Sequence, residues 1–289
     1  MNITGFSQIP AGFLGERFGE RAVLVIISIT LNYLTIQNTY HSPKQPTPWF
    51  ARSNPTPVFY AKILMIVLKA SRLCNKRAYT NDRWIQSSLN TVKALESVGG
   101  RFEIQNLAVP RKLESSCVFV SNHMSILETF VLPCLIQPYR DVTFVVKESL
   151  LSFPYFKHVM RNRNPIVVGR ANPREDLRTV LEEGQNRLNA NISVIIFPQT
   201  TRSINFDPQT FNSLGVKLAK RGKVPVIPVA LKTDAWGNGR KFKDFGKIRP
   251  AKAVHISFGD PLLVQGSGKE EHKFIVDFIA KKLDSYLHQ

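Results

Sequence analysis

From residue 117 onward, short apolar runs alternate with longer segments of helical periodicity, and this alternation limits the folds that the chain can adopt. The runs have the character of buried strands, and they lie at Cys117–Val120, Val142–Val146, Ile166–Val168, Ile192–Phe197, Val224–Leu231 and Val254–Phe258. Helical patterns lie between or after them at Pro173–Asn189, Phe211–Arg221 and Glu270–Leu287. This order predicts an α/β fold with a mostly parallel central sheet flanked by helices.

The chain is strongly basic, with 39 lysines and arginines against 21 acidic residues and a formal charge of +18. Such a surface favours anionic partners: nucleic acid, anionic lipid headgroups or a phosphorylated substrate. The basic residues are scattered, and no RNP-like, helix-turn-helix or zinc-finger pattern accompanies them. We therefore expect no nucleic-acid binding, and we expect lipid or phosphate partners.

The first 98 residues are predicted to form N-terminal membrane-associating helices, and residues 99–289 are predicted to form the α/β domain. Ala22–Ile36 is mostly apolar, but a helix of this length reaches only about 22 Å across a hydrocarbon core of about 30 Å. The segment therefore predicts a marginal membrane anchor, with a buried amphiphilic helix as the alternative. Residues 39–57 are rich in proline and predict a linker or a surface strap.

A second apolar segment, Val58–Leu73, overlaps lysines at seven-residue spacing, namely Lys62, Lys69 and Lys76. On a helix this spacing forms one basic stripe beside an apolar face. The pattern is typical of a helix that lies in an anionic bilayer interface, and a core helix with one solvated edge is the alternative. Asn81–Val98 predicts a further amphipathic helix, and the two glycines that follow it, Gly99 and Gly100, are expected to end it.

Three cysteines, Cys74, Cys117 and Cys134, lack the paired spacing of a zinc site or of CxxC redox chemistry. The last two lie among apolar residues and are predicted to be buried thiols, with a metal site shared with His123 as the alternative. Free thiols need no oxidising compartment, so we expect a domain that faces the cytosol.

His123 follows directly after a predicted strand, and Glu128 lies five residues later. A histidine at a strand end with a nearby carboxylate is suited to act as a general base with an orienting acid. The alternative is structural, because Ser125 and Glu128 have the spacing of a capping box at a helix start. Both roles place Glu128 in the first helical turn, so they are compatible.

Further polar residues follow other predicted strands. Lys147 and Arg170 are cations at strand exits, where a solvated surface charge is the alternative. Residues 197–203, Phe-Pro-Gln-Thr-Thr-Arg-Ser, bring hydroxyl groups and Arg202 to a turn after the strand at 192–197. A planar guanidinium suits phosphate recognition. Because sites form at the carboxyl ends of parallel strands, these residues predict a phosphate pocket beside a histidine base.

Four ordered blocks in this region resemble those of the glycerolipid acyltransferases, the lysophosphatidic acid acyltransferase family. The blocks are Asn122-His123…Glu128, Lys147…Arg170, residues 197–203 and Val224–Val229, and the resemblance covers Val118 to Pro261. It implies a glycerol-3-phosphate acyltransferase-like fold. It also implies a membrane-associated enzyme that transfers a fatty acyl group from a thioester to the free hydroxyl of a lysophospholipid, first of all 1-acyl-sn-glycerol-3-phosphate.

The family resemblance also implies roles for individual residues. His123 and Glu128 would be catalytic, with direct transfer, no covalent acyl-enzyme, no metal ion and no cofactor beyond acyl-ACP or acyl-CoA as co-substrate. The substrate would be bound by the following residues: Lys147, Arg170, Gln199, Thr200, Thr201 and Arg202. The expected partners are an anionic membrane surface, a lysophospholipid and acyl carrier protein or CoA, at the cytoplasmic face of the inner or cell membrane.

Two departures from the family pattern affect the acceptor more than the chemistry. Glu128 stands where the family usually has Asp, and the Glu side chain is longer than Asp by one methylene. Gln199 and Thr200 replace Glu and Gly of the third block, removing a negative charge and adding a Cβ near the expected phosphate site. Transfer to another lysophospholipid, or a lipid-binding protein of this fold without activity, are therefore the alternatives.

Overall fold

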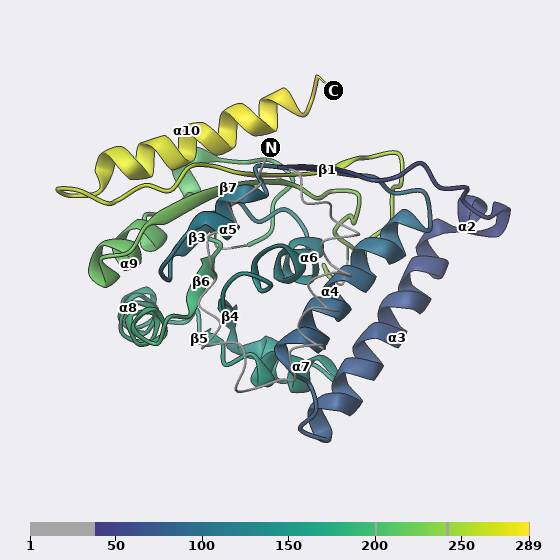
Figure 1. The fold of residues 1–289 in the computed structure, drawn as a ribbon, viewed down its shortest axis with the longest axis horizontal. Helices are drawn as coiled ribbons and strands as arrows, with labels where there is room; N and C mark the ends of the chain where they lie inside the picture. Colours follow the sequence, from purple (N-terminus) through teal and green to yellow (C-terminus); the bar gives the residue numbers. More distant parts are fainter. Residues whose placement is uncertain (1–37, 200, 241–242, 289) are drawn as a thin grey trace, which may run out of the picture. The chain divides into compact units, whose positions relative to one another are not determined.

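A computed structural model describes residues 38–199, 201–240 and 243–288. The predictions for Ala22–Ile36 and for Thr200 lie outside the described residues. The described residues belong to one compact unit, Gln37–Gln289, built around a single sheet (Figure 1). The strands are β1 Thr39–His41, β2 Phe102–Gln105, β3 Val118–Ser121, β4 Val142–Lys147, β5 Ile166–Val168, β6 Ser193–Ile196, β7 Val226–Lys232 and β8 Val254–Phe258.

The strand order in the sheet is β1-β2-β8-β7-β3-β6-β4-β5. The pairs β7–β3, β3–β6, β6–β4 and β4–β5 are parallel, as is β2–β8. Only the described pairs β1–β2 and β7–β8 are antiparallel. The predicted α/β fold with a mostly parallel sheet is therefore confirmed. It places the carboxyl ends of four neighbouring strands, β3, β6, β4 and β5, along one edge.

Helices cover both faces of the sheet (Figure 1). The longer ones are α3 Pro55–Asn75, α4 Asn81–Glu96, α6 Leu127–Ile136, α8 Pro173–Asn189, α9 Leu214–Gly222 and α10 Lys269–Ser285; the short ones are α2 Trp49–Ser53, α5 Ala108–Lys112 and α7 Phe156–Asn162. The apolar sides of α8, α9 and α10 form one core cluster with the central strands. Gly215 lets α9 approach β3 closely, because a Cβ there would lie 2.2 Å from a Val120 methyl group.

The opposite face is covered by helices from the first half of the chain. Within β4, Val145 packs toward the cluster of α8 to α10, whereas the neighbouring Phe144 packs against Trp84 of α4 with ring centroids 6.3 Å apart. The Ser88 hydroxyl of α4 donates to the Phe130 carbonyl of α6 at 2.6 Å, so α4 and α6 are also joined by a polar contact. The apolar face that predicted the helix at Asn81–Val98 is thus buried in the core.

The compact unit begins before residue 99, which differs from the expected division into residues 1–98 and 99–289. Residues 39–57, predicted as a linker, hold β1, α2 and the start of α3. The reason is that β1 pairs with β2, while Tyr40 and Ser42 donate hydrogen bonds to the buried Glu96 carboxylate at 2.6 and 2.5 Å. Residues before position 99 therefore complete the sheet and its core.

Helix α3 shows apolar side chains on two sides. Phe59 and Ile63 are buried, whereas Leu64 and Met65 are 54% and 63% exposed. The Lys62 ammonium donates to Ser97 Oγ at 2.6 Å, so this member of the expected basic stripe contacts the end of α4. Within the described residues, no helix combines the length and the apolar character needed to cross a membrane.

Candidate active site

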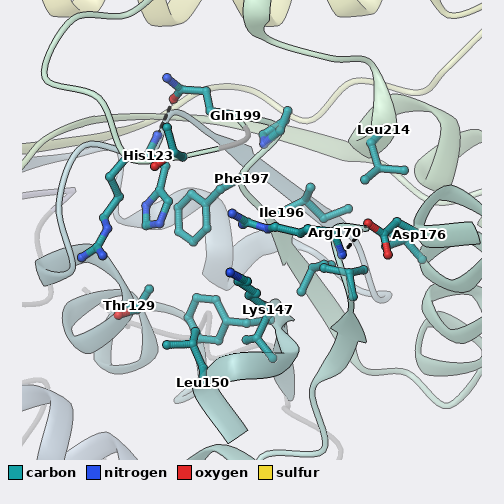
Figure 2. A pocket seen from close by; sticks show the side chains of 18 of the residues that line it. His123, Thr129, Lys147, Leu150, Arg170, Asp176, Ile196, Phe197, Gln199 and Leu214 are labelled. Carbon is teal, nitrogen blue, oxygen red and sulfur yellow. Dashed lines mark hydrogen bonds between the residues drawn. The ribbon is translucent and has the colours of Figure 1, made fainter. Parts of the chain in front are cut away.

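The carboxyl ends of β3, β4, β5 and β6 border a cavity of about 670 Å³ (Figure 2). Each of these strands places at least one predicted site residue at its exit. The predicted residues that line the cavity are His123, Lys147, Arg170, Gln199, Thr201 and Arg202. Thr200 lies outside the described residues, and Glu128 lies behind His123, completely buried. The sequence-predicted residues thus converge from separate strands on one space.

His123 and Glu128 form a hydrogen-bonded pair, with 3.0 Å between His123 Nδ1 and Glu128 Oε1. The His123 side chain is 16% exposed and reaches the cavity, whereas the Glu128 side chain has no exposure. When Nδ1 donates its proton to the carboxylate, the lone pair of a neutral imidazole is on Nε2. This tautomer is the one that a base needs to accept a proton from a ligand in the cavity.

Glu128 is held by a ring of donors at the start of α6. The backbone N–H groups of Met124 and Ser125 donate to Oε1 at 2.7 and 2.9 Å, and the Thr233 hydroxyl donates to Oε2 at 2.7 Å. Burial alone would raise the pKa of Glu128, but the hydrogen bond and the charge of His123, together with the hydrogen bonds from Thr233 and Ser125, lower it below the ordinary value. The carboxylate is therefore ionised at neutral pH, and both expected roles, capping and orienting, coexist.

The segment after β6 holds His123 on three sides. The imidazole stacks on the ring of Phe197 with centroids 4.3 Å apart. The Gln199 Oε1 atom accepts from the His123 backbone N–H at 2.6 Å (Figure 2), and Ser203 N–H donates to the His123 carbonyl at 2.9 Å. Gln199, predicted to bind substrate, is only 5% exposed and uses its amide oxygen on the backbone of His123.

Four described cations line the cavity: Lys147, Arg170, Arg202 and Lys217. Figure 2 shows the Lys147 and Arg170 side chains extending toward Phe197. Arg170 has a left-handed backbone with φ 64°, and the turn is pinned because the N–H groups of Gly169 and Arg170 donate to Asp176 at 3.0 and 2.9 Å. An excess of cations beside a base suits an anionic ligand.

The roles of several residues of the site were not predicted from the sequence. Asn122 joins β3 to β7, because its amide donates to the Leu231 carbonyl at 2.7 Å and accepts from the Leu231 N–H at 2.9 Å. Thr233 holds Glu128, Lys217 of α9 faces the cavity, and Asp244 pairs with Arg202. The place of Thr233 just beyond the strand Val224–Leu231 was the available signal for it.

Comparison with known proteins agrees with this geometry. The family model described as Acyltransferase matches residues 101–232, which include the histidine, the carboxylate and the cations up to Lys217. This match supports the resemblance to the glycerolipid acyltransferases that the four motif blocks indicate.

Named relatives and one solved structure define the similarity further. The chain is 28% identical to 1-acyl-sn-glycerol-3-phosphate acyltransferase of Pseudomonas aeruginosa, over 59% of this chain and 62% of that protein. It is 31% identical to 1-acyl-sn-glycerol-3-phosphate acyltransferase beta of Homo sapiens, over 52% and 54%. The chain thus spans less than two thirds of the length of either relative.

The crystal structure of the 1-acyl-sn-glycerophosphate (LPA) acyltransferase PlsC from Thermotoga maritima superposes with a TM-score of 0.59, covering 81% of this chain and 95% of that one. At 19% identity, this match concerns the fold.

Proposed function

We propose that this protein is a membrane-associated O-acyltransferase that moves a fatty acyl group from a thioester to the free hydroxyl of a lysophospholipid, with 1-acyl-sn-glycerol-3-phosphate as acceptor and phosphatidic acid as product. The observation that carries the proposal is the His123–Glu128 pair, whose histidine lines a cavity together with four described cations. The names of the relatives agree with this acceptor.

In the proposed reaction His123 Nε2 takes the proton of the acceptor hydroxyl while the hydroxyl oxygen attacks the thioester carbonyl carbon. Glu128 stabilises the resulting imidazolium, because its buried carboxylate bonds Nδ1. The tetrahedral intermediate then collapses, the carbon–sulfur bond breaks, and the imidazolium returns the proton to the leaving thiolate. No atom of the protein becomes acylated, and the site residues need no metal ion or cofactor for these steps.

The acceptor phosphate would be held by the cavity cations, with Lys147, Arg170 and Arg202 as the principal ligands. An arginine fork and an ammonium group both favour phosphate oxygens. Acyl-ACP and acyl-CoA are the two candidate donors, and each carries negative charge that matches the basic chain.

The purified protein, given mixed lysophospholipids with acyl-ACP and then with acyl-CoA, tests this function by product analysis. We expect phosphatidic acid as the main product. Saturable transfer to a different acceptor would replace the proposed acceptor and keep the reaction. Undetectable transfer to every acceptor, with liposome binding retained, would instead identify a lipid-binding protein of this fold.

We further propose that an apolar face beside the cavity contacts the membrane at its cytoplasmic side. This face comprises Leu64 and Met65 of α3 with Phe153, Tyr155 and Phe245, all of them between 42% and 63% exposed. Phe153 and Phe245 have ring centroids 6.4 Å apart, and Phe245 also contacts Tyr60, one helical turn before Leu64. Leu150, three residues before Phe153, and Asp244, directly before Phe245, line the cavity. A lysolipid in the bilayer would therefore have a short path to it.

Replacing Leu64 and Met65 together by glutamine should weaken binding to phosphatidylglycerol-containing vesicles about tenfold or more, because two exposed apolar side chains lose their burial in lipid. Vesicle co-sedimentation measures the effect. Leu263→Gln is the matched control, since Leu263 is 67% exposed and lies between β8 and α10. Equal binding of the double variant and the control would refute the assignment of this face.

Gln199→Ala should lower kcat about tenfold and leave the KM for the acceptor nearly unchanged, because it leaves the His123 N–H without its acceptor. Gln199→Glu should keep most of the activity, since a carboxylate oxygen can accept the same hydrogen bond. Steady-state kinetics with varied acceptor separate the two constants. A raised KM with an unchanged kcat would return Gln199 to the role of a substrate ligand.

A further inference from the structure

The cavity contains an ion pair that joins Arg202 to Asp244, with 2.6 Å between Arg202 Nη2 and Asp244 Oδ1. Both residues line the cavity, and their side chains are 15% and 30% exposed. The other terminal nitrogen, Arg202 Nη1, is buried and has no hydrogen-bond partner in the described part of the chain. A buried donor without a partner is unfavourable, so this nitrogen is suited to an oxygen of a ligand.

Contacts on both sides fix the position of Asp244. On its N-terminal side in the sequence, the Asn238 amide donates to the Met124 carbonyl at 3.0 Å, and Lys243 Nζ donates to Thr201 Oγ1 at 2.8 Å. After it, the Gly246 carbonyl accepts from the Tyr60 hydroxyl at 2.8 Å. The carboxylate is therefore held beside Arg202 by the same segment that contacts the loop of His123.

We propose that Asp244 is a specificity-determining residue: an internal counter-ion that competes with the acceptor headgroup for Arg202 and so limits how tightly the cavity binds phosphate. The inference rests on the proposed function, because it concerns the acceptor of that reaction. A phosphate on Nη1 would lie close to the carboxylate on Nη2, and the two negative charges would repel each other.

This limit has a direct use in the reaction. Acceptor and product carry the same phosphate headgroup, so whatever tightens binding of one also tightens binding of the other. Four described cations line the cavity, and of its acids Asp176 already accepts from two backbone N–H groups. Asp244 is thus the acid whose charge is placed to moderate headgroup affinity and to let the product leave.

Asp244→Asn tests the proposal, because the amide keeps a hydrogen-bond acceptor for Arg202 and removes only the charge. The acceptors form a charge series: lysophosphatidic acid with a phosphate monoester, lysophosphatidylglycerol with a monoanionic diester, and uncharged monoacylglycerol. We expect the KM for lysophosphatidic acid to fall about three- to tenfold, the KM for the diester to fall less, and the KM for the uncharged acceptor to stay constant. Phosphatidic acid should also become a stronger inhibitor, with an inhibition constant that falls by a similar factor.

Asp260→Asn is the matched control, since Asp260 is exposed, follows β8 and is not among the cavity residues. An unchanged or raised KM for lysophosphatidic acid in Asp244→Asn would overturn the proposal. A lowered KM of equal size in Asp260→Asn would also overturn it, because the effect would then be one of net charge.

A second readout separates this inference from the proposed function. Calorimetric titration with short-chain lysophosphatidic acid, without any thioester, measures headgroup affinity independently of turnover. Absence of transfer in the wild-type protein with tighter binding by Asp244→Asn would contradict the function and support the counter-ion. Transfer by the wild-type protein, with equal binding constants in the two proteins, would support the function and contradict the counter-ion.

Discussion

Replacing His123 by alanine is expected to lower the rate of acyl transfer by about 10²–10⁴-fold, the usual contribution of a positioned general base. The imidazole is held by Glu128 at 3.0 Å and by stacking on Phe197, so its Nε2 atom faces a ligand in one fixed orientation. Alanine removes the only group of this pair that contacts the cavity. Thiol release from the donor, measured at saturating acceptor, checks the prediction.

Two controls separate loss of chemistry from loss of structure. Vesicle binding and the unfolding midpoint of His123→Ala should stay close to those of the wild-type protein, because the ring lies at the cavity surface rather than in the core. His288→Ala should retain full activity, since that side chain is 78% exposed near the end of the chain. Turnover by His123→Ala at the wild-type rate would rule out the proposed mechanism.

The parts of the fold that were predicted correctly are those with a strong local pattern. Strands β3, β4 and β8 are largely buried on both faces, and β5 is a run of three apolar residues, so all four stand out in the sequence. Strand β2 was missed because in Phe102–Gln105 the polar residues Glu103 and Gln105 alternate with the apolar ones, so no apolar run marks the strand. Helix α9 begins at Leu214 instead of Phe211, because Phe211 is buried in extended backbone before the helix.

The candidate site divides in the same way. His123, Glu128 and the cations at strand exits belong to motifs that are contiguous in sequence. Thr233 and Asp244 act through partners more than 40 residues away, and only the folded sheet brings them there. Gln199 was predicted to lie in the site, but its contact with the His123 backbone is a tertiary detail that its motif does not contain.

Removing the charge of Glu128 is expected to have an effect close to that of removing His123. Glu128→Gln should lower kcat about 10³–10⁴-fold, because an amide can present a donor to Nδ1 and so favour the wrong tautomer. Glu128→Asp keeps the charge but withdraws the carboxylate by one methylene, away from a histidine that Glu128 reaches at 3.0 Å. We expect its activity to lie between the glutamine variant and the wild-type protein.

The stability of these variants should follow the lowered pKa of Glu128. A carboxyl group with a folded-state pKa below its unfolded value stabilises the fold above the unfolded pKa, and this contribution is lost as the pH falls through the folded pKa. Glu128→Gln should therefore unfold at lower urea concentration than the wild-type protein at pH 7, and the difference should shrink in acid. Thr233→Val offers a matched test, because it removes one donor to Oε2 and leaves the charge in place. The same two variants test the role of the charge in turnover, because Thr233→Val keeps it and Glu128→Gln removes it. If both transferred acyl groups at the same rate, the charge would not contribute to turnover, and Glu128 would act only as a helix cap.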